Sequence, residues 1–129
     1  MERPRILLVD DEVAFADNLL KLLSKRGYDV IVAYNGADAV NMVGEKEFDV
    51  IILDMKMPGM DGIATLKEIR KIAPLVEVVI LTGHGSVESG IEGMQLGAFD
   101  FLMKPVRIDD LQEKVSEAYQ RKLIQRERE

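Results

Sequence analysis

The chain has 129 residues, of which 47% are hydrophobic and 31% charged, and its formal net charge is −6 at pH 7. This size and composition indicate one globular domain with its own core, and the acidic balance argues against direct nucleic-acid binding. The absence of cysteine excludes disulfides and thiol chemistry; with no apolar segment of membrane-spanning length and no secretory signal at the start, we expect a cytoplasmic protein.

Short apolar segments alternate with amphipathic ones along the chain. The apolar segments predict β-strands at residues 5–9, 30–34, 49–53, 77–81 and 99–103. Helical spacing of apolar residues predicts helices at 13–25, 37–45, 63–72 and 87–96, with a last helix beginning near Ile108. This alternation is typical of a single α/β domain with a doubly wound parallel sheet. We expect residues 1–119 to form the domain and the charged residues 120–129 to be a helical extension or the start of a linker.

Four of the predicted strands end on polar residues. The first is followed by Asp10 and Asp11, the third by Asp54, the fourth by Thr82 and the fifth by Lys104. In open α/β sheets the ligand site lies beyond the carboxyl ends of the strands, so these side chains are predicted to converge on one pocket. Carboxylates, a hydroxyl and an ammonium together favour a site for a divalent cation and a phosphoryl group.

The predicted carboxylate cluster also indicates which metal ion would bind. Clustered negative charges are costly unless a cation neutralises them, and oxygen ligands without His or Cys select a hard ion, best Mg²⁺. The alternative is that the triplet Asp10-Asp11-Glu12 only caps the following helix. The triplet alone leaves both interpretations open, whereas the polar residues at the other strand ends favour the metal site.

Four motifs in order resemble those of response-regulator receiver domains, the phosphoacceptor modules of bacterial two-component signalling. They are LLVDDE at 7–12, LDMKMPGMDG at 53–62, LTGHG at 81–85 and FDFLMKP at 99–105, and the resemblance runs from about Arg5 to Tyr119. It implies a flavodoxin-like (βα)5 fold with strand order 2-1-3-4-5. It also implies a phosphorylation-controlled signalling switch that catalyses its own phosphorylation and dephosphorylation and is not a metabolic enzyme.

The resemblance assigns roles at the acidic end of the pocket. Asp54 is expected to be the nucleophile that accepts a phosphoryl group from a histidine kinase. Asp11 is expected to bind Mg²⁺ directly, and Asp10 directly or through water. Asp54 itself and the backbone carbonyl of Lys56 complete the expected protein ligands.

The remaining site residues are expected to hold the phosphoryl group and to transmit its arrival. Lys104 is expected to pair with Asp54 at rest and with a phosphoryl oxygen afterwards, while Thr82 and the backbone N–H of Gly83 hold other oxygens. Phe101 stands where the family places its switch aromatic. The Lys104–Pro105 peptide is expected to be cis. His84 is interpreted as a solvated loop residue.

Three other interpretations agree less well with the same residues. A flavodoxin-like FMN module needs a hydroxyl- and glycine-rich loop after the first strand, where this chain has the acidic triplet DDE. An aspartate-nucleophile phosphohydrolase needs a second acid two residues after the nucleophile, where this chain has Lys56. A degenerate receiver that acts only as an interaction module is disfavoured because the set of site residues is complete.

The expected partners are a cognate histidine kinase or phosphotransfer protein and an output domain or the transcription machinery, with no membrane and no nucleic acid bound by this domain. We also expect a phosphorylation-dependent homodimer through the face formed by the fourth helix, fifth strand and fifth helix. Three observations motivate this dimer. Thr82 and Phe101 connect the expected phosphoryl group to this face. Gly90 and Gly93 weaken the fourth helix, and Tyr119, Leu123 and Ile124 spread beyond the inward stripe of the fifth.

Overall fold

The computed structural model describes residues 3–57, 59–83 and 87–127. All ten predicted elements are present, and their predicted ends are correct to within one residue. The strands are β1 (Arg5–Val9), β2 (Asp29–Ala33), β3 (Val50–Asp54), β4 (Glu77–Thr82) and β5 (Asp100–Met103). The helices are α1 (Val13–Lys25), α2 (Gly36–Glu45), α3 (Gly62–Ile72), α4 (Val87–Gln95) and α5 (Ile108–Glu127).

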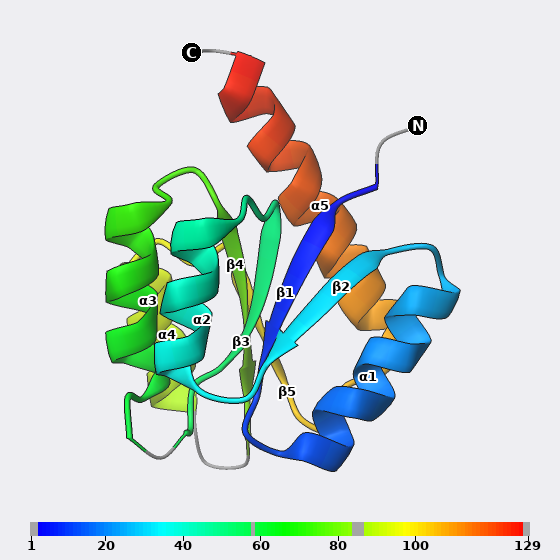
Figure 1. The fold of residues 1–129 in the computed structure, drawn as a ribbon, viewed down its shortest axis with the longest axis horizontal. Helices are drawn as coiled ribbons and strands as arrows, with labels where there is room; N and C mark the ends of the chain where they lie inside the picture. Colours follow the sequence, from blue (N-terminus) through cyan, green and yellow to red (C-terminus); the bar gives the residue numbers. More distant parts are fainter. Residues whose placement is uncertain (1–2, 58, 84–86, 128–129) are drawn as a thin grey trace.

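The strands form one parallel sheet in the order β2-β1-β3-β4-β5, as the resemblance implied. Helices α1 and α5 cover one face, and α2, α3 and α4 cover the other (Figure 1). The carboxyl ends of the strands therefore lie together at one edge, which is the lower edge in Figure 1. Among the described residues, none of the helices is long and apolar enough to cross a membrane.

The core consists of two layers separated by the sheet. Successive residues of a strand point to opposite faces, so Leu7 and Val9 pack under α2 and α3 while Ile6 and Leu8 pack under α1 and α5. Every residue of the central strand β3 is buried, including Asp54 at its end. A continuous apolar strand is the expected consequence of burial on both faces.

Helix α5 contains one correction to the sequence analysis. Leu111, Val115 and Ala118 are fully buried as expected, but the prediction that Tyr119 faces outward is wrong, because only 7% of this residue is exposed. Positions 115, 118, 119 and 122 lie on the same side of a helix, so the buried stripe of α5 is wider than predicted from the sequence. Leu123 is half-buried against the core, and Ile124 is exposed as predicted.

Candidate functional site

Strand register brings the predicted site residues to one place. Val9 on β1 pairs with Leu53 on β3, and Thr82 on β4 pairs with Met103 on β5. Polar residues at or just beyond these pairs meet at the carboxyl edge of the sheet. They are Asp10, Asp54, Thr82 and Lys104, and all but Lys104 are buried.

Lys104 is the cation at the centre of the site. Its Nζ lies 2.8 Å from Asp10 Oδ2, 3.1 Å from Glu12 Oε1 and 3.8 Å from Asp54 Oδ2. At rest the ammonium is therefore closer to Asp10 and Glu12 than to Asp54, although it is in reach of all three. Its side chain is 13% exposed and those of Asp10 and Asp54 are buried, so these two ion pairs are largely shielded from water, whereas Glu12 is exposed.

Three carboxylates converge on the space beside Lys104. One oxygen from each of Asp10, Glu12 and Asp54 lies within 4.8 Å of the other two. Asp11 is half-buried in the same loop and is not one of these three. Glu12 is a member that the sequence analysis did not assign to the metal site.

The capping alternative for the acidic triplet finds no support in the geometry. Glu12 occupies the N-cap position of α1, but its side chain makes no capping hydrogen bond. Its backbone N–H instead donates to Asp10 Oδ1 at 2.9 Å, and its carboxylate meets Lys104. The triplet therefore belongs to the ionic site more than to the helix end.

Burial raises the pKa of Asp54 from its ordinary value to about 6. The N–H of Lys56, which donates to Asp54 Oδ1 at 3.1 Å, and the charge of Lys104 lower it, whereas the negative charges of Asp10 and Asp11 raise it. For Lys104, burial favours the neutral form, but hydrogen bonds to Asp10 and Glu12 outweigh it and raise the pKa. The site thus holds more negative charge than Lys104 alone neutralises.

The Thr82 hydroxyl is a buried group that lacks a partner. Thr82 is fully buried, and its Oγ1 makes no hydrogen bond with any described residue. Buried hydroxyls are usually paired, so an unpaired one at the mouth of a strand points to a ligand that would bond it. Gly83 follows directly and is half-buried, whereas His84 and Gly85 lie outside the described residues.

The other predicted positions lie near this pocket. Lys56 exposes its side chain, and its carbonyl as a metal ligand stays a prediction. The Lys104–Pro105 peptide is cis, as expected. Phe101 on β5 is half-buried and packs against the core layer beneath α4, where its ring contacts Gly90.

The donor set fits a hard divalent cation. The converging groups are carboxylate oxygens, and the described residues contain no cysteine and no histidine. Such ligands suit Mg²⁺, which keeps several of its waters when few protein groups bind it. Burial is the main cause of the raised pKa of Asp54, and the negative charges of Asp10 and Asp11 raise it further; a cation would neutralise these charges.

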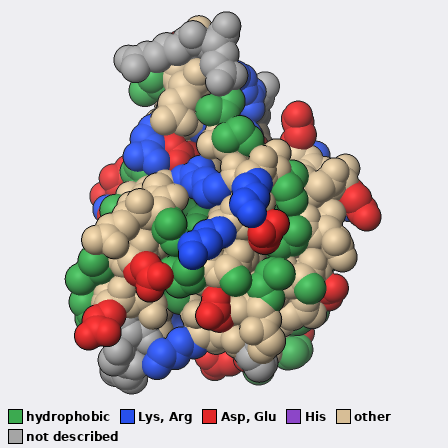
Figure 2. Space-filling model, turned by 90° about the vertical axis from the view of Figure 1, so that its left-hand side faces the viewer, with side chains coloured by type: hydrophobic (Ala, Val, Ile, Leu, Met, Phe, Trp, Pro, Cys, Tyr) green, Lys and Arg blue, Asp and Glu red, His purple; other side chains and the backbone are tan. Residues whose placement is uncertain are grey.

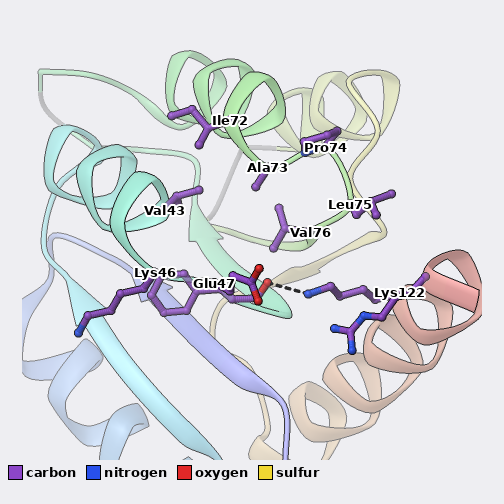
Figure 3. A pocket seen from close by; sticks show the side chains of 11 residues that line it. Val43, Lys46, Glu47, Ile72, Ala73, Pro74, Leu75, Val76 and Lys122 are labelled. Atoms are coloured by element: carbon purple, nitrogen blue, oxygen red, sulfur yellow. Dashed lines mark hydrogen bonds between the residues drawn. The ribbon is translucent and has the colours of Figure 1, made fainter. Parts of the chain in front are cut away.

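A cavity of about 460 Å³ at the amino end of the sheet has different chemistry. Lys122 reaches into it from α5, as Figure 3 shows, and its Nζ donates to the Phe48 carbonyl at 3.0 Å and to Asp49 Oδ1 at 2.8 Å. The Nζ is therefore engaged by the protein itself, and Val43, Ile72 and neighbouring apolar groups form the walls of the cavity. Among the residues that line it, the cavity offers no cluster of acidic ligands.

The face that carries α2, α3 and α4 also lacks the features of a phosphoryl site. Lys and Arg side chains gather near its middle with hydrophobic groups around them (Figure 2). A shallow hollow of about 380 Å³ between α3 and α4 has an apolar floor that includes Met60 and Leu96, with Lys67 and Lys71 among the residues that line it. The carboxyl edge of the sheet therefore remains the candidate site.

Comparison with known proteins identifies the family. The family model described as "Response regulator receiver domain" matches residues 6–116. The chain belongs to this family. Its acidic pocket of Asp10, Glu12 and Asp54 is thus the pocket of a receiver domain, a phosphoacceptor signalling module.

Full-length relatives of this receiver are transcriptional regulators. It is 46% identical over 113 residues to the transcriptional regulatory protein ZraR of Salmonella typhimurium, covering 88% of the chain and 26% of the relative. It is 36% identical over 127 residues to the regulatory protein AtoC of Escherichia coli, covering 95% and 27%. The chain spans about a quarter of the length of these relatives.

Solved receiver structures have the same fold. A response regulator receiver domain protein from Clostridium thermocellum superimposes with a TM-score of 0.90 at 39% identity, covering 94% of this chain and 98% of that one. NtrX from Brucella abortus superimposes with a TM-score of 0.91 at 32% identity, covering 98% of this chain and 29% of that one.

Proposed function

We propose that this receiver is a phosphorylation-controlled switch that accepts a phosphoryl group on Asp54 from a histidine kinase or a phosphotransfer protein. The observation that carries the proposal is the environment of Asp54. Asp54 is 3% exposed, and its carboxylate faces the Lys104 ammonium and shares the strand edge with the unpaired hydroxyl of Thr82. A nucleophile, a cation and a free donor are the groups that phosphoryl transfer requires.

In the proposed step, a carboxylate oxygen of Asp54 attacks phosphorus and the phosphorus–nitrogen bond to the kinase histidine breaks. The electron pair of that bond leaves with the imidazole, and Asp54 becomes an acyl phosphate. Lys104 moves its ammonium from Asp10 and Glu12 toward a phosphoryl oxygen, and the hydroxyl of Thr82 and the N–H of Gly83 donate to others. These groups stabilise the charge on the transferring group by position, not by covalent chemistry.

Asp10, Asp11, Asp54 and the carbonyl of Lys56 are proposed to hold Mg²⁺, and Glu12 joins them as a candidate because its carboxylate lies in the cluster. When bound, the ion neutralises charge on the phosphoryl oxygens. Its positive charge would also favour the ionised form of Asp54, whose pKa is raised by burial and by the neighbouring carboxylates, so that this side chain is ionised as a nucleophile must be.

The proposed output is a change in the surface formed by α4, β5 and α5. Thr82 would move toward the phosphoryl group, and Phe101 would fill the space it leaves. The changed surface would control an output domain or the transcription machinery, in line with the regulatory relatives, and would favour a homodimer. We propose that the domain works in the cytoplasm, in keeping with this role.

Intact mass measurement after incubation with acetyl phosphate and Mg²⁺ tests the phosphoacceptor. We expect the wild-type protein to gain one phosphoryl group and Asp54→Asn to gain none. Asp49→Asn, at the opposite edge of the sheet, is the control and should be labelled like the wild type. Labelling of Asp54→Asn to the wild-type extent contradicts the assignment.

A further inference from the structure

One side of the Lys104 ammonium faces an aromatic ring instead of a carboxylate. Phe15, in the first turn of α1, lies with its ring centroid 4.3 Å from Lys104 Nζ. This distance is well inside the range in which the negative face of an aromatic ring attracts a cation. Phe15 is half-buried and packs against the core layer under α1 and α5, so the ring is held in place.

The other partners of Lys104 fix its position at rest but not during the proposed step. Lysine carries its charge on a flexible stem of four carbons. Glu12 is 65% exposed at its side chain, so water and salt compete for its bond to Lys104. Asp10 is buried and holds the ammonium firmly at rest, but in the proposed step Lys104 has to leave Asp10 for the phosphoryl group.

A ring differs from a carboxylate in one useful respect. It attracts the ammonium without bearing a formal charge, so it neither attracts Mg²⁺ strongly nor repels an incoming phosphoryl group. Contact with Phe15 can therefore persist while Lys104 exchanges one oxygen partner for another.

We propose that Phe15 is a positioning residue for the phosphoryl-transfer reaction, which keeps the Lys104 ammonium at the mouth of the pocket through its ring face. The proposal rests on the proposed function of Asp54 and Lys104. Phe15 touches neither the phosphoryl group nor the metal in this role; it acts only through Lys104.

The structure offers a matched control. Phe99 also packs against the core layer under α1 and α5 and also has a cation over its ring, since Arg121 Cζ lies 4.8 Å from the centroid. It precedes β5, at the end of the sheet away from the pocket. Phe99→Leu therefore removes an equivalent ring and an equivalent cation contact without touching Lys104.

The test compares Phe15→Leu, Phe15→Tyr and Phe99→Leu by NMR and by phosphorylation with acetyl phosphate and Mg²⁺. In the wild type the ring current of Phe15 should shift the ε-methylene protons of Lys104 upfield. Phe15→Leu should abolish that shift, and the other two variants should keep it. We expect phosphorylation of Phe15→Leu to be about fivefold slower than that of the wild type, with Phe15→Tyr and Phe99→Leu near the wild-type rate.

Each other outcome has a distinct meaning. The positioning role is overturned if Phe15→Leu is phosphorylated at the wild-type rate, or if Phe99→Leu loses as much of that rate as Phe15→Leu does. It is also overturned if the ε-methylene proton shift of Lys104 in Phe15→Leu equals that of the wild type. If Phe15→Leu does not fold, Phe15→Met replaces it, because Met keeps the apolar volume without a ring. Failure of the wild type itself to accept a phosphoryl group overturns the proposed function of Asp54 instead, while the NMR comparison still decides whether the ring holds Lys104.

Discussion

The ring of Phe101 on β5 packs directly against the backbone of Gly90 on α4. A methyl group on Gly90 would lie 2.9 Å from Cδ2 of that ring, closer than carbon atoms approach without rearrangement. Gly90 is thus required for close packing, and the same holds for Gly93, where a methyl group would meet Ile80. The position of α4 and the position of Phe101 are therefore coupled in the resting receiver.

This coupling predicts the effect of Gly90→Ala. Alanine favours a helix by up to about 1 kcal/mol over glycine, but here its methyl group forces either the Phe101 ring or α4 to move. We expect altered amide shifts in α4 and β5 of the unphosphorylated protein and no gain in thermal stability. Gly44→Ala in α2 is the control, because nothing lies within 4 Å of its methyl group and it should stabilise the protein. Unchanged β5 shifts in Gly90→Ala would contradict the coupling.

The raised pKa of Asp54 predicts how stability depends on pH without metal. Folded Asp54 keeps its proton up to about pH 6, whereas an unfolded aspartate releases it near 3.8. Between these values the folded state binds more protons, so this residue lowers the free energy of unfolding as pH rises. We expect Asp54→Asn to be more stable than the wild type at pH 7 in EDTA and to lose that advantage toward pH 4. Urea unfolding at several pH values measures this; a pH-independent difference would contradict the titration.

Much of the fold could be predicted from sequence because the signals were local. A segment such as VIIL before Asp54 is apolar on both faces, which only a central parallel strand requires. Turn glycines and the prolines set the element ends. Once the strands are parallel, their carboxyl ends have to share an edge, so Asp10, Asp54, Thr82 and Lys104 could be placed together before any contact was known.

The parts that sequence did not reveal depend on distant partners. The role of Glu12 follows from Lys104, which is 92 positions away along the chain, and the role of Phe15 follows from the same ammonium. Lys122 was assigned to a charged tail, yet its ammonium is anchored to Phe48 and Asp49. No local pattern distinguishes such a lysine from a solvated one, because its burial depends on a carboxylate that the distant loop before β3 supplies.

Mg²⁺ is expected to bind weakly, with a dissociation constant on the order of millimolar, because few protein groups ligate it and Lys104 opposes it. NMR titration should show saturable shifts at residues 10–12, 54–56 and 104. We expect Asp11→Ala to weaken binding, and parallel titration of Glu12→Ala measures whether the third carboxylate of the cluster contributes. Wild-type affinity in Asp11→Ala would show that the predicted ligand set is wrong.

Because the hydroxyl of Thr82 is unpaired, we expect its removal to impair the switch while leaving the stability of the resting protein nearly unchanged. Thr82→Val removes a group without a partner among the described residues. The free energy of unfolding of the resting protein should therefore fall by less than about 0.5 kcal/mol or rise. Thr65→Val is the contrasting variant, because buried Thr65 donates its Oγ1 hydrogen to the Asp61 carbonyl at 2.7 Å, and it should lose about 1 kcal/mol or more. With beryllofluoride and Mg²⁺, Thr82→Val should fail to show the wild-type shift changes at Phe101. Full changes in that variant would remove Thr82 from the switch.

The dimer that we propose to depend on phosphorylation would use exposed apolar residues on α4 and β5. Val87, Ile91 and Met94 on α4 and Met103 on β5 expose a large part of their side chains. Contiguous apolar groups at a surface commonly mark a partner site, and a twofold dimer is the commonest arrangement of identical chains. Burial of Tyr119 reduces the contribution of α5 to this surface, so α4 and β5 are expected to supply most of it.

Sedimentation velocity with and without beryllofluoride and Mg²⁺ measures this dimer. Beryllofluoride mimics the aspartyl phosphate, and a ligand shifts an equilibrium only by its differential affinity for the two states. We therefore expect a monomer at rest and a dimer with the mimic at high micromolar concentration. Ile91→Lys should keep the activated protein monomeric because it places a charge in the interface. Ile72→Lys on α3 is the control and should dimerise normally, since Ile72 is 44% exposed and Ile91 50%. A monomer in both states of the wild type, or equal disruption by the two variants, would exclude this face as the dimer interface.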